Sequence, residues 1–299
     1  SYLSHSSQAI PLIQFGVFDG PSSLNLENSS YSISSFVSDW DETHYKEAFD
    51  QVLAYIEAGD IYQANLTFSL FADFEGDTWT FYKDLQKKQK VKHGAFVDLD
   101  SETSILSRSP ELFFKTDSEM NISTRPMKGT QPRDLDAEKD KQNLKFLKND
   151  IKNRAENLMI VDLLRNDISR ISKVGTVKVP ELYRVETYET VHQMTSLIIG
   201  EMNKKTTITE LFEALFPCGS ITGAPKIRAM EIIHELEQRP RDIYCGTIGW
   251  MTPDGSSEFN VAIRTLLMQN EKAVLNVGGG VVFDSTAKSE YEEALWKSR

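Results

Sequence analysis

The chain has 299 residues, of which 40% are hydrophobic and 26% charged, a composition typical of globular proteins. Its net charge of −11 argues against a nucleic-acid-binding surface. No apolar run approaches the roughly 18 residues of a membrane span, and the N-terminus shows no signal pattern. The two cysteines, Cys218 and Cys245, form no CxxC pair, which predicts a reducing compartment and no zinc site. We therefore expect a cytoplasmic metabolic enzyme with neither membrane nor nucleic acid as partner.

Apolar periodicity and turn residues predict the elements of the first half of the chain. Strands are expected at 10–18, 60–68, 96–99, 102–107, 110–114 and 120–124, and helices at 43–58 and 79–90. Gly59 ends the first helix, and on the strand at 60–68 Gln63 shares a face with Ile61 and Thr67.

The second half is predicted to begin with a long polar helix and to end with three strands and a helix. Helices are expected at 136–171, 208–216, 225–238 and 289–298, and strands at 182–188, 191–199, 246–251, 259–268 and 273–283. Pro225 would occupy the favourable first position of its helix. Strands come in pairs and helices do not alternate regularly with them, which favours an α+β fold with antiparallel sheets.

Lys128 is the first candidate for chemistry, in the stretch 124–133, TRPMKGTQPR. It follows a predicted strand that Gly129 and Pro132 stop, and Arg125 flanks it. A lysine beside a glycine that admits a ligand to the backbone can be a nucleophile or an anion clamp. The alternative is a solvated turn lysine.

The second candidate is a cation site in the last helix, after Gly278-Gly279-Gly280. On a helix, Glu290, Glu293 and Lys297 share one face. Two carboxylates suit magnesium, and the glycines would let backbone N–H groups meet a substrate carboxylate. The alternative is a surface ladder of salt bridges.

Glu156 and Asn153 share a face of the long helix, and Glu156 could complete a three-carboxylate magnesium site. The segment 217–226, PCGSITGAPK, is a glycine-rich loop that leads into a helix and could bind an anion. It lacks the P-loop spacing, and an ordinary capped helix start explains it equally well.

Arg264 and His192 are candidates on strands. Arg264 would lie in mid-strand on a face with small neighbours, which leaves room for a bidentate carboxylate partner. His192 is a natural general acid or base, although a strand histidine is more often structural.

Taken together, these strings resemble the chorismate-utilising enzymes, a family that includes anthranilate, aminodeoxychorismate, isochorismate and salicylate synthases. The matching strings are AENLMIVDLLRND (155–167), FPCGSITGAPK (216–226), YCG (244–246), FNVAIRT (259–265) and GGGVVFDS…SEYEE (278–293). The resemblance runs from about Asp60 to the C-terminus. It implies an α+β fold of two packed, mainly antiparallel sheets with helices outside and the active site in a cleft. Residues 1–40 would form a variable N-terminal segment and residues 41–299 the catalytic domain.

The resemblance also implies roles for individual residues. Magnesium would be held by Glu156, Glu290 and Glu293, although Asn153 stands where some members have a further glutamate. Substrate contacts are implied for Arg264, Lys297, Tyr244, Thr222, Gly223, Gly280 and Gln63. Glu111 would handle protons, and His192 would assist departure of the leaving group.

Two positions separate the subfamilies. Members that add water to the ring carry a lysine base where this chain has Gln63, which cannot deprotonate water. Ammonia needs no such base. Anthranilate synthases usually read Pro-Ile-Ala-Gly-Thr where this chain has Pro126-Met127-Lys128-Gly129-Thr130, and a lysine there is typical of aminodeoxychorismate synthases. Lys128 would attack C2 of chorismate as a neutral amine, so that ammonia enters at C4.

We therefore expect a magnesium-dependent amination of chorismate at C4 to 4-amino-4-deoxychorismate, the precursor of 4-aminobenzoate and folate. Ammonia would come from a separate glutamine amidotransferase subunit in a heterodimer. The alternatives are amination at C2 with loss of pyruvate, as in anthranilate synthases, and a non-catalytic protein with the same fold.

Overall fold

The computed structural model describes residues 10–23, 26–100 and 102–296. The chain divides into two compact units, each with its own sheet. Unit 1 comprises Ser1–Pro110, Ile221–Gly246 and Ala262–Arg299, and unit 2 comprises Glu111–Ser220 and Thr247–Val261. The boundary near Ser220 falls in a short 3₁₀ helix, η1 (Gly219–Ile221). The division at residue 40 expected from the sequence stays a prediction.

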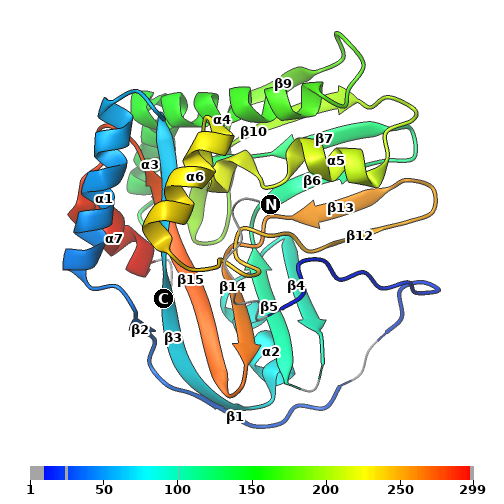
Figure 1. Cartoon of the computed structure of the whole chain (residues 1–299), viewed down its shortest axis with the longest axis vertical. Coiled ribbons are helices and arrows are strands. Elements are labelled where there is room, and N and C mark those ends of the chain that lie inside the picture. The colour runs from blue at the N-terminus through cyan, green and yellow to red at the C-terminus, as the bar shows by residue number, and fades with distance from the viewer. Residues whose placement is uncertain (1–9, 24–25, 101, 297–299) are drawn as a thin grey trace. The chain divides into compact units, whose positions relative to one another are not determined.

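Unit 1 is built on an eight-stranded antiparallel sheet with the order β1-β3-β15-β14-β5-β4, in which β2 and β11 also pair with β3 (Figure 1). Its strands are β1 (Tyr31–Ile33), β2 (Val37–Ser38), β3 (Gln63–Gly76), β4 (His93–Asp98), β5 (Thr103–Ser109), β11 (Gly223–Ala224), β14 (Thr265–Gln269) and β15 (Lys272–Val281). From Gln63 to Leu70 every residue of β3 is buried, so both faces of this central strand are covered.

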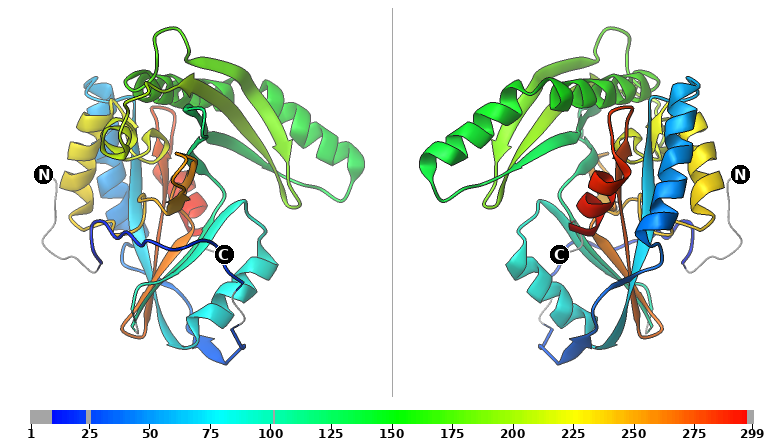
Figure 2. Two further views of the ribbon diagram at one scale, coloured as in Figure 1. Left: turned by 90° about the vertical axis from the view of Figure 1, so that its right-hand side faces the viewer. Right: turned by 90° about the vertical axis from the view of Figure 1, so that its left-hand side faces the viewer.

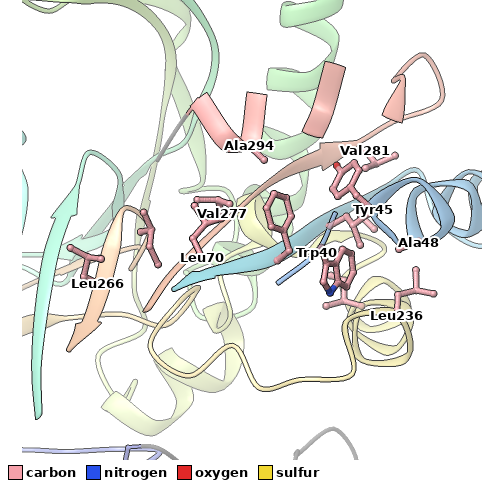
Figure 3. Packing of buried hydrophobic residues seen from close by; sticks show 14 of the residues in the cluster. Trp40, Tyr45, Ala48, Leu70, Leu236, Leu266, Val277, Val281 and Ala294 are labelled. Atoms are coloured by element: carbon pink, nitrogen blue, oxygen red, sulfur yellow. The ribbon is translucent and has the colours of Figure 1, made fainter. Parts of the chain in front are cut away.

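The described part of unit 1 contains four helices. They are α1 (Glu42–Glu57), α2 (Thr78–Lys88), α6 (Lys226–Glu237) and α7 (Ala287–Trp296). Asp41 and Asp77 cap α1 and α2 by accepting backbone N–H bonds. In the two views of Figure 2, α1 (blue) lies beside α6 (yellow) and α7 (red), and α1 contacts both helices. Between helices and sheet lies an apolar core that includes Trp40, Tyr45 and Ala294 (Figure 3).

Unit 2 is built on a seven-stranded antiparallel sheet with the order β12-β13-β6-β7-β10-β8, in which β9 also pairs with β10. Its strands are β6 (Leu112–Thr116), β7 (Asn121–Arg125), β8 (Met127–Pro132), β9 (Lys178–Thr187), β10 (Val191–Glu201), β12 (Gly249–Met251) and β13 (Ser257–Asn260). The strands β7 and β8 both pair with β10, and Pro126 separates them. The α+β fold with two antiparallel sheets expected from the sequence is confirmed.

The helices of unit 2 correct one expectation. They are α3 (Ala137–Asn149), α4 (Ile151–Ser169) and α5 (Ile208–Leu215). The single long helix predicted at 136–171 is wrong, because Asp150 has extended backbone angles and separates α3 from α4. Its carboxylate accepts the Asn153 backbone N–H at 2.8 Å and so caps α4.

The apolar stretch 10–18 is not a strand, contrary to the sequence prediction. From Pro11 to Phe18 the residues are exposed, for example Leu12 at 83% and Val17 at 89%, and none of the described strands pairs with the stretch. Apolar sequence alone does not make a strand without a partner edge.

The predicted strand at 259–268 is also wrong as a single element. Its two ends belong to different sheets, since β13 pairs with β6 in unit 2 and β14 pairs with β5 and β15 in unit 1. The connection includes Arg264, whose φ is +50°. A regular strand cannot contain this left-handed conformation, so the chain leaves one sheet here and enters the other.

Pro225 is the N-cap of α6 and not its first helical residue, and it provides no side-chain cap. Over the described ranges 10–23, 26–100 and 102–296, every helix is too short or too polar to cross a bilayer.

Candidate active site

Lys128 lies inside β8, whereas the sequence predicted the end of a strand. The neighbouring strand β10 pairs Thr195 with Met127 and Gln193 with Thr130. Two residues of β8, Lys128 and Gly129, therefore face one residue of β10, which is a β-bulge. The Lys128 side chain is half-buried, and within the described residues its amine has neither a hydrogen bond nor an ion pair.

Glu111, just before β6, is buried with 4% exposure. Burial raises the pKa of its carboxyl group to about 7, while a hydrogen bond with Ser220 and the charge of Lys128 pull the pKa down. A group that titrates near neutrality can both take up and give up a proton. Glu111 and Lys128, whose charge lowers the pKa of Glu111, both belong to unit 2.

Arg125 flanks Lys128 in the sequence and lies on β7. Its Nη1 binds Glu181 at 2.8 Å and Glu186 at 3.1 Å. Two carboxylates compensate this guanidinium, so it presents little net positive charge to its surroundings.

His192 is almost fully buried on β10, and both of its ring nitrogens have partners. Nε2 lies 3.0 Å from Asp140 Oδ1, and Nδ1 lies 3.0 Å from Thr187 Oγ1. Asp140 Oδ1 also accepts a hydrogen bond from Arg133 Nε at 2.8 Å. This bond is the largest of the causes that lower the pKa of Asp140 to about 2. No motif pointed to Asp140, which lies 52 positions from His192 in the sequence.

Glu156 lies on α4, half-buried, and has no hydrogen-bond or ion-pair partner in the part of unit 2 that is described. Asn153, on the same face, is already bound: its Nδ2 donates to Asp150 Oδ2 at 2.8 Å. Of these two residues, Asn153 is therefore already engaged, and the carboxylate of Glu156 is the group open to a ligand.

Arg264 of unit 1 is exposed, and its guanidinium has no acidic partner among the described residues. Its position in the left-handed connection, and not a strand face, directs its side chain. A guanidinium without a counter-ion can bind a carboxylate through two parallel hydrogen bonds, one to each carboxylate oxygen.

Gln63 begins β3 and is fully buried, yet neither its Oε1 nor its Nε2 has a hydrogen-bond partner within the described part of the chain. An unpaired buried amide costs free energy, and ligands or water usually satisfy such groups. Tyr244 is also buried, and this burial raises the pKa of its phenol, which therefore stays protonated as a donor.

The glycine positions lie in strands. Gly223 pairs with Ala64 of β3, and a Cβ there would lie 2.1 Å from the Gln63 carbonyl oxygen. Only glycine permits this approach. Gly280 pairs with Asn65 inside β15, so the glycine run is part of the sheet and not a loop. Thr222 accepts the Asn65 N–H through its carbonyl at 2.8 Å.

The carboxylates of Glu290 and Glu293 share one face of α7, as the sequence predicted. After burial, these two charges are the main causes that raise the pKa of Tyr45, whose hydroxyl is buried without a hydrogen-bond partner among the described residues. Glu290 Oε1 accepts from Ser285 Oγ at 2.7 Å. Lys297 lies outside the described residues.

These oxygen donors fit the chemistry of magnesium, which takes one or two carboxylates and completes its shell with water and substrate. The unpartnered Tyr45 hydroxyl beside them marks a polar group that a hydrated ion could satisfy. Within the described ranges, no group of three or more histidine, cysteine, aspartate or glutamate side chains is close enough to hold a metal by itself.

The fold defines a class of α+β protein built from two units, each on its own antiparallel sheet. The family model of the chorismate binding enzymes matches residues 6–299. The chain belongs to this family.

Individual relatives agree with this assignment. The chain is 43% identical over 267 residues to aminodeoxychorismate synthase component 1 of Escherichia coli, covering 88% of this chain and 58% of the relative. It is 38% identical to anthranilate synthase component 1 of Saccharolobus solfataricus, covering 87% and 62%. The solved structure of anthranilate synthase component I from Streptococcus pneumoniae superposes with a TM-score of 0.81 at 31% identity, covering 92% and 60%. The chain thus spans about three fifths of the length of these relatives.

Proposed function

We propose that this protein is an aminodeoxychorismate synthase component I, which aminates chorismate at C4 with ammonia to give 4-amino-4-deoxychorismate and water. Similarity to proteins named aminodeoxychorismate synthase component 1 supports this proposal. The observation that carries it is the state of the Lys128 amine, which lacks a hydrogen-bond or ion-pair partner among the described residues. Its positive charge lowers the pKa of the buried acid Glu111.

In the proposed reaction, Lys128 Nζ forms a bond to C2 of the ring. Both ring double bonds shift by one position, the C4–O bond breaks, and the hydroxyl leaves as water. Ammonia then bonds to C4, the double bonds shift back, and the C2–N bond breaks to release Lys128. Two allylic displacements replace one direct substitution.

Glu111 is the proposed proton carrier for these steps. A pKa of about 7 lets it accept the proton that Lys128 must lose before attack. The same proton can then pass to the departing hydroxyl. A carboxyl group with an ordinary pKa would be a poorer acid for that second transfer.

Unit 1 supplies the proposed substrate contacts. Arg264 would bind a chorismate carboxylate through its unpaired guanidinium, and Tyr244, Thr222, Gly223, Gly280 and Lys297 are proposed as further contacts. Gln63 offers a buried amide that can accept a hydrogen bond from ammonia but cannot deprotonate water. This chemistry favours ammonia over water as the second reactant.

Magnesium is the proposed cofactor, and Glu290 and Glu293 of α7 would hold it, while the ligand role expected for Glu156 from the sequence stays a prediction. When bound, the ion would supply positive charge for a substrate carboxylate. His192 can exchange a proton with the substrate only after its bond to Asp140 or Thr187 opens, so its catalytic role stays a prediction.

A glutamine amidotransferase subunit is the proposed source of ammonia, in line with the designation component 1 of the similar proteins. The pathway would be 4-aminobenzoate and folate synthesis in the cytoplasm.

The test is to identify the product. The protein is incubated with chorismate, ammonium and magnesium, with and without an added aminodeoxychorismate lyase. We expect 4-aminobenzoate only when the lyase is present. Anthranilate formed by the protein alone would instead support the anthranilate synthase reaction, and turnover of neither kind with retained chorismate binding would support a non-catalytic role.

Lys128→Ala should reduce formation of the C4 amine by at least roughly a thousandfold, because a nucleophile is lost. Lys115→Ala is the matched control, since Lys115 is an exposed lysine of the same sheet that pairs with Glu258. Equal losses in the two variants would exclude a specific role for Lys128.

A further inference from the structure

The β-bulge that contains Lys128 is held by a buried side chain from the neighbouring strand. Gln193 of β10 is 8% exposed, and its amide bonds to both residues that follow Lys128. Its Nε2 donates to the Gly129 carbonyl at 2.8 Å, and its Oε1 accepts from the Thr130 hydroxyl at 2.8 Å.

These two bonds replace backbone pairing that the bulge disrupts. A bulge leaves an extra residue without its regular ladder partner, and bulges near active sites often redirect a side chain. Here the Gly129 carbonyl finds its partner in a side-chain amide. The orientation of the Lys128 Cα–Cβ bond therefore depends on Gln193.

The opposite side of the bulge is closed by packing. Gly129 has a φ of +85°, and a Cβ there would lie 2.6 Å from Asn153 Oδ1 and 3.0 Å from Leu147 Cδ1. Asn153 is fixed in turn by Asp150. The backbone at Gly129 is thus held between Gln193 and the helices α3 and α4, with little freedom to shift.

We propose that Gln193 is a positioning residue for Lys128, which fixes the bulge so that the amine is directed at the substrate carbon. This inference rests on the proposed function, because it assigns Lys128 the role of nucleophile. Gln193 itself touches no reacting atom in this scheme. Its contribution is to restrict Lys128 to a reactive orientation, and a displacement of about 1 Å can cost a hundredfold in rate.

The experiment measures the Lys128–substrate adduct directly. Wild type and Gln193→Met are mixed with chorismate and magnesium without ammonia, quenched over time, and analysed by intact-protein mass spectrometry. Methionine keeps the length of the side chain but removes both hydrogen bonds. We expect adduct formation to slow by about ten- to a hundredfold, while the Kd for chorismate changes less than threefold.

Further variants separate positioning from folding. Gln193→Glu retains an acceptor for Thr130 but loses the donor to Gly129, and we expect an intermediate loss of adduct rate. Ile198→Val, a core substitution in the same strand, lowers stability and should leave the rate unchanged. If Gln193→Met fails to fold, Gln193→Glu and Thr130→Val decide the question, because each removes one bond at the bulge.

The outcomes distinguish the two levels of the proposal. Adduct in wild type together with an unchanged rate in the Gln193 variants overturns the positioning role and leaves the proposed function intact. Equal losses of adduct rate in Ile198→Val and Gln193→Met would show that only stability matters, which also overturns it. No adduct in wild type without ammonia, together with anthranilate as the product once ammonium is added, overturns the proposed function and the positioning role together.

Discussion

The two units of this protein carry their candidate groups in contrasting states. In unit 2, polar side chains of β7 and β10 are bonded to neighbours: Arg125 to two glutamates, His192 through both ring nitrogens, and Gln193 to two positions of β8. In unit 1, Arg264 and Gln63 have no side-chain partners among the described residues.

This contrast indicates different roles for the candidate groups of the two units. Interlocked side chains hold one reactive group, the Lys128 amine, in a defined position, which lowers the entropy lost when a reaction occurs there. Unpaired groups instead are available to a ligand, whose binding would satisfy them. Under the proposed function, Lys128 and Glu111 of unit 2 would carry the chemistry and Arg264 and Gln63 of unit 1 the recognition, with the unpaired Glu156 as an exception in unit 2. Three substitutions test that interpretation, in order of decreasing expected effect.

Of these three substitutions, the largest effect is expected at Glu111, the proposed proton carrier of unit 2. Glu111→Gln should lower turnover by about a hundredfold, as loss of a general acid–base group typically does. Wild-type turnover should also change near pH 7, where this carboxyl titrates, and the variant should lack that change. The pH–rate profile is the measurement, and Glu119→Gln, at an exposed position of the same unit, is the control. A variant with the wild-type profile would contradict the role.

The same substitution has a stability consequence with a definite sign. The folded-state pKa of Glu111 lies at about 7, above its ordinary value of 4.5, so the native state binds this proton more tightly than the unfolded state. Its stabilising contribution is complete below pH 4.5 and is lost as the pH rises through 7. Glu111→Gln should therefore gain up to roughly 3 kcal/mol relative to wild type above pH 7. Urea unfolding at pH 4 and pH 8 measures the difference, and a constant difference at both pH values would contradict it.

A smaller effect is expected at Arg264, the unpaired cation of unit 1. Arg264→Gln should raise the KM for chorismate by about ten- to a hundredfold, because a charge-assisted hydrogen bond is lost. Turnover at saturating substrate should change little if the contact serves recognition. Arg228→Gln is the matched control, since Arg228 is already paired with Asp60 and Glu231. A fall in kcat at unchanged KM would show instead that unit 1 takes part in the chemical step.

The smallest effect is expected at Asp150, which separates α3 from α4. Asp150→Ala removes the cap of α4 and the bond that fixes Asn153, and should lower the free energy of unfolding by about 1 kcal/mol. Chemical denaturation measures this change, with Lys152→Ala in the exposed first turn as the control. An effect on adduct formation larger than the effect on stability would show that α4 also supports the Lys128 bulge.

The sequence predicted several elements well because their signals are local. The helices at 43–58 and 79–90 correspond closely to α1 and α2, and the hairpin near 96–107 corresponds to β4 and β5. Periodicity and the end signal Gly59 act within a few residues, so they can be recognised without tertiary information. The family resemblance and the α+β fold class followed from the order of the motifs.

The errors arise where distant contacts decide the conformation. The stretch 10–18 is apolar but finds no strand edge, and the run 259–268 is continuous in pattern although its halves belong to different sheets. The helix break at Asp150 was missed because the sequence pattern of a capping aspartate in a polar helix is weak. The first two of these choices depend on partners far away in the sequence, whereas the break at Asp150 is a local cap made three residues along the chain.

The sequence by itself determined which side chains are present: a lysine before Gly129, a glutamine at 63, and glutamates one turn apart on the last helix. The tertiary structure decided which of them are already satisfied. It paired Arg125 and His192 with acids, left Lys128 and Arg264 without hydrogen-bond or ion-pair partners among the described residues, and placed Gln193 against the Lys128 bulge. The physical reason is that the types of charge and hydrogen-bonding group are local properties, whereas their neutralisation depends on neighbours that only folding brings within bonding distance.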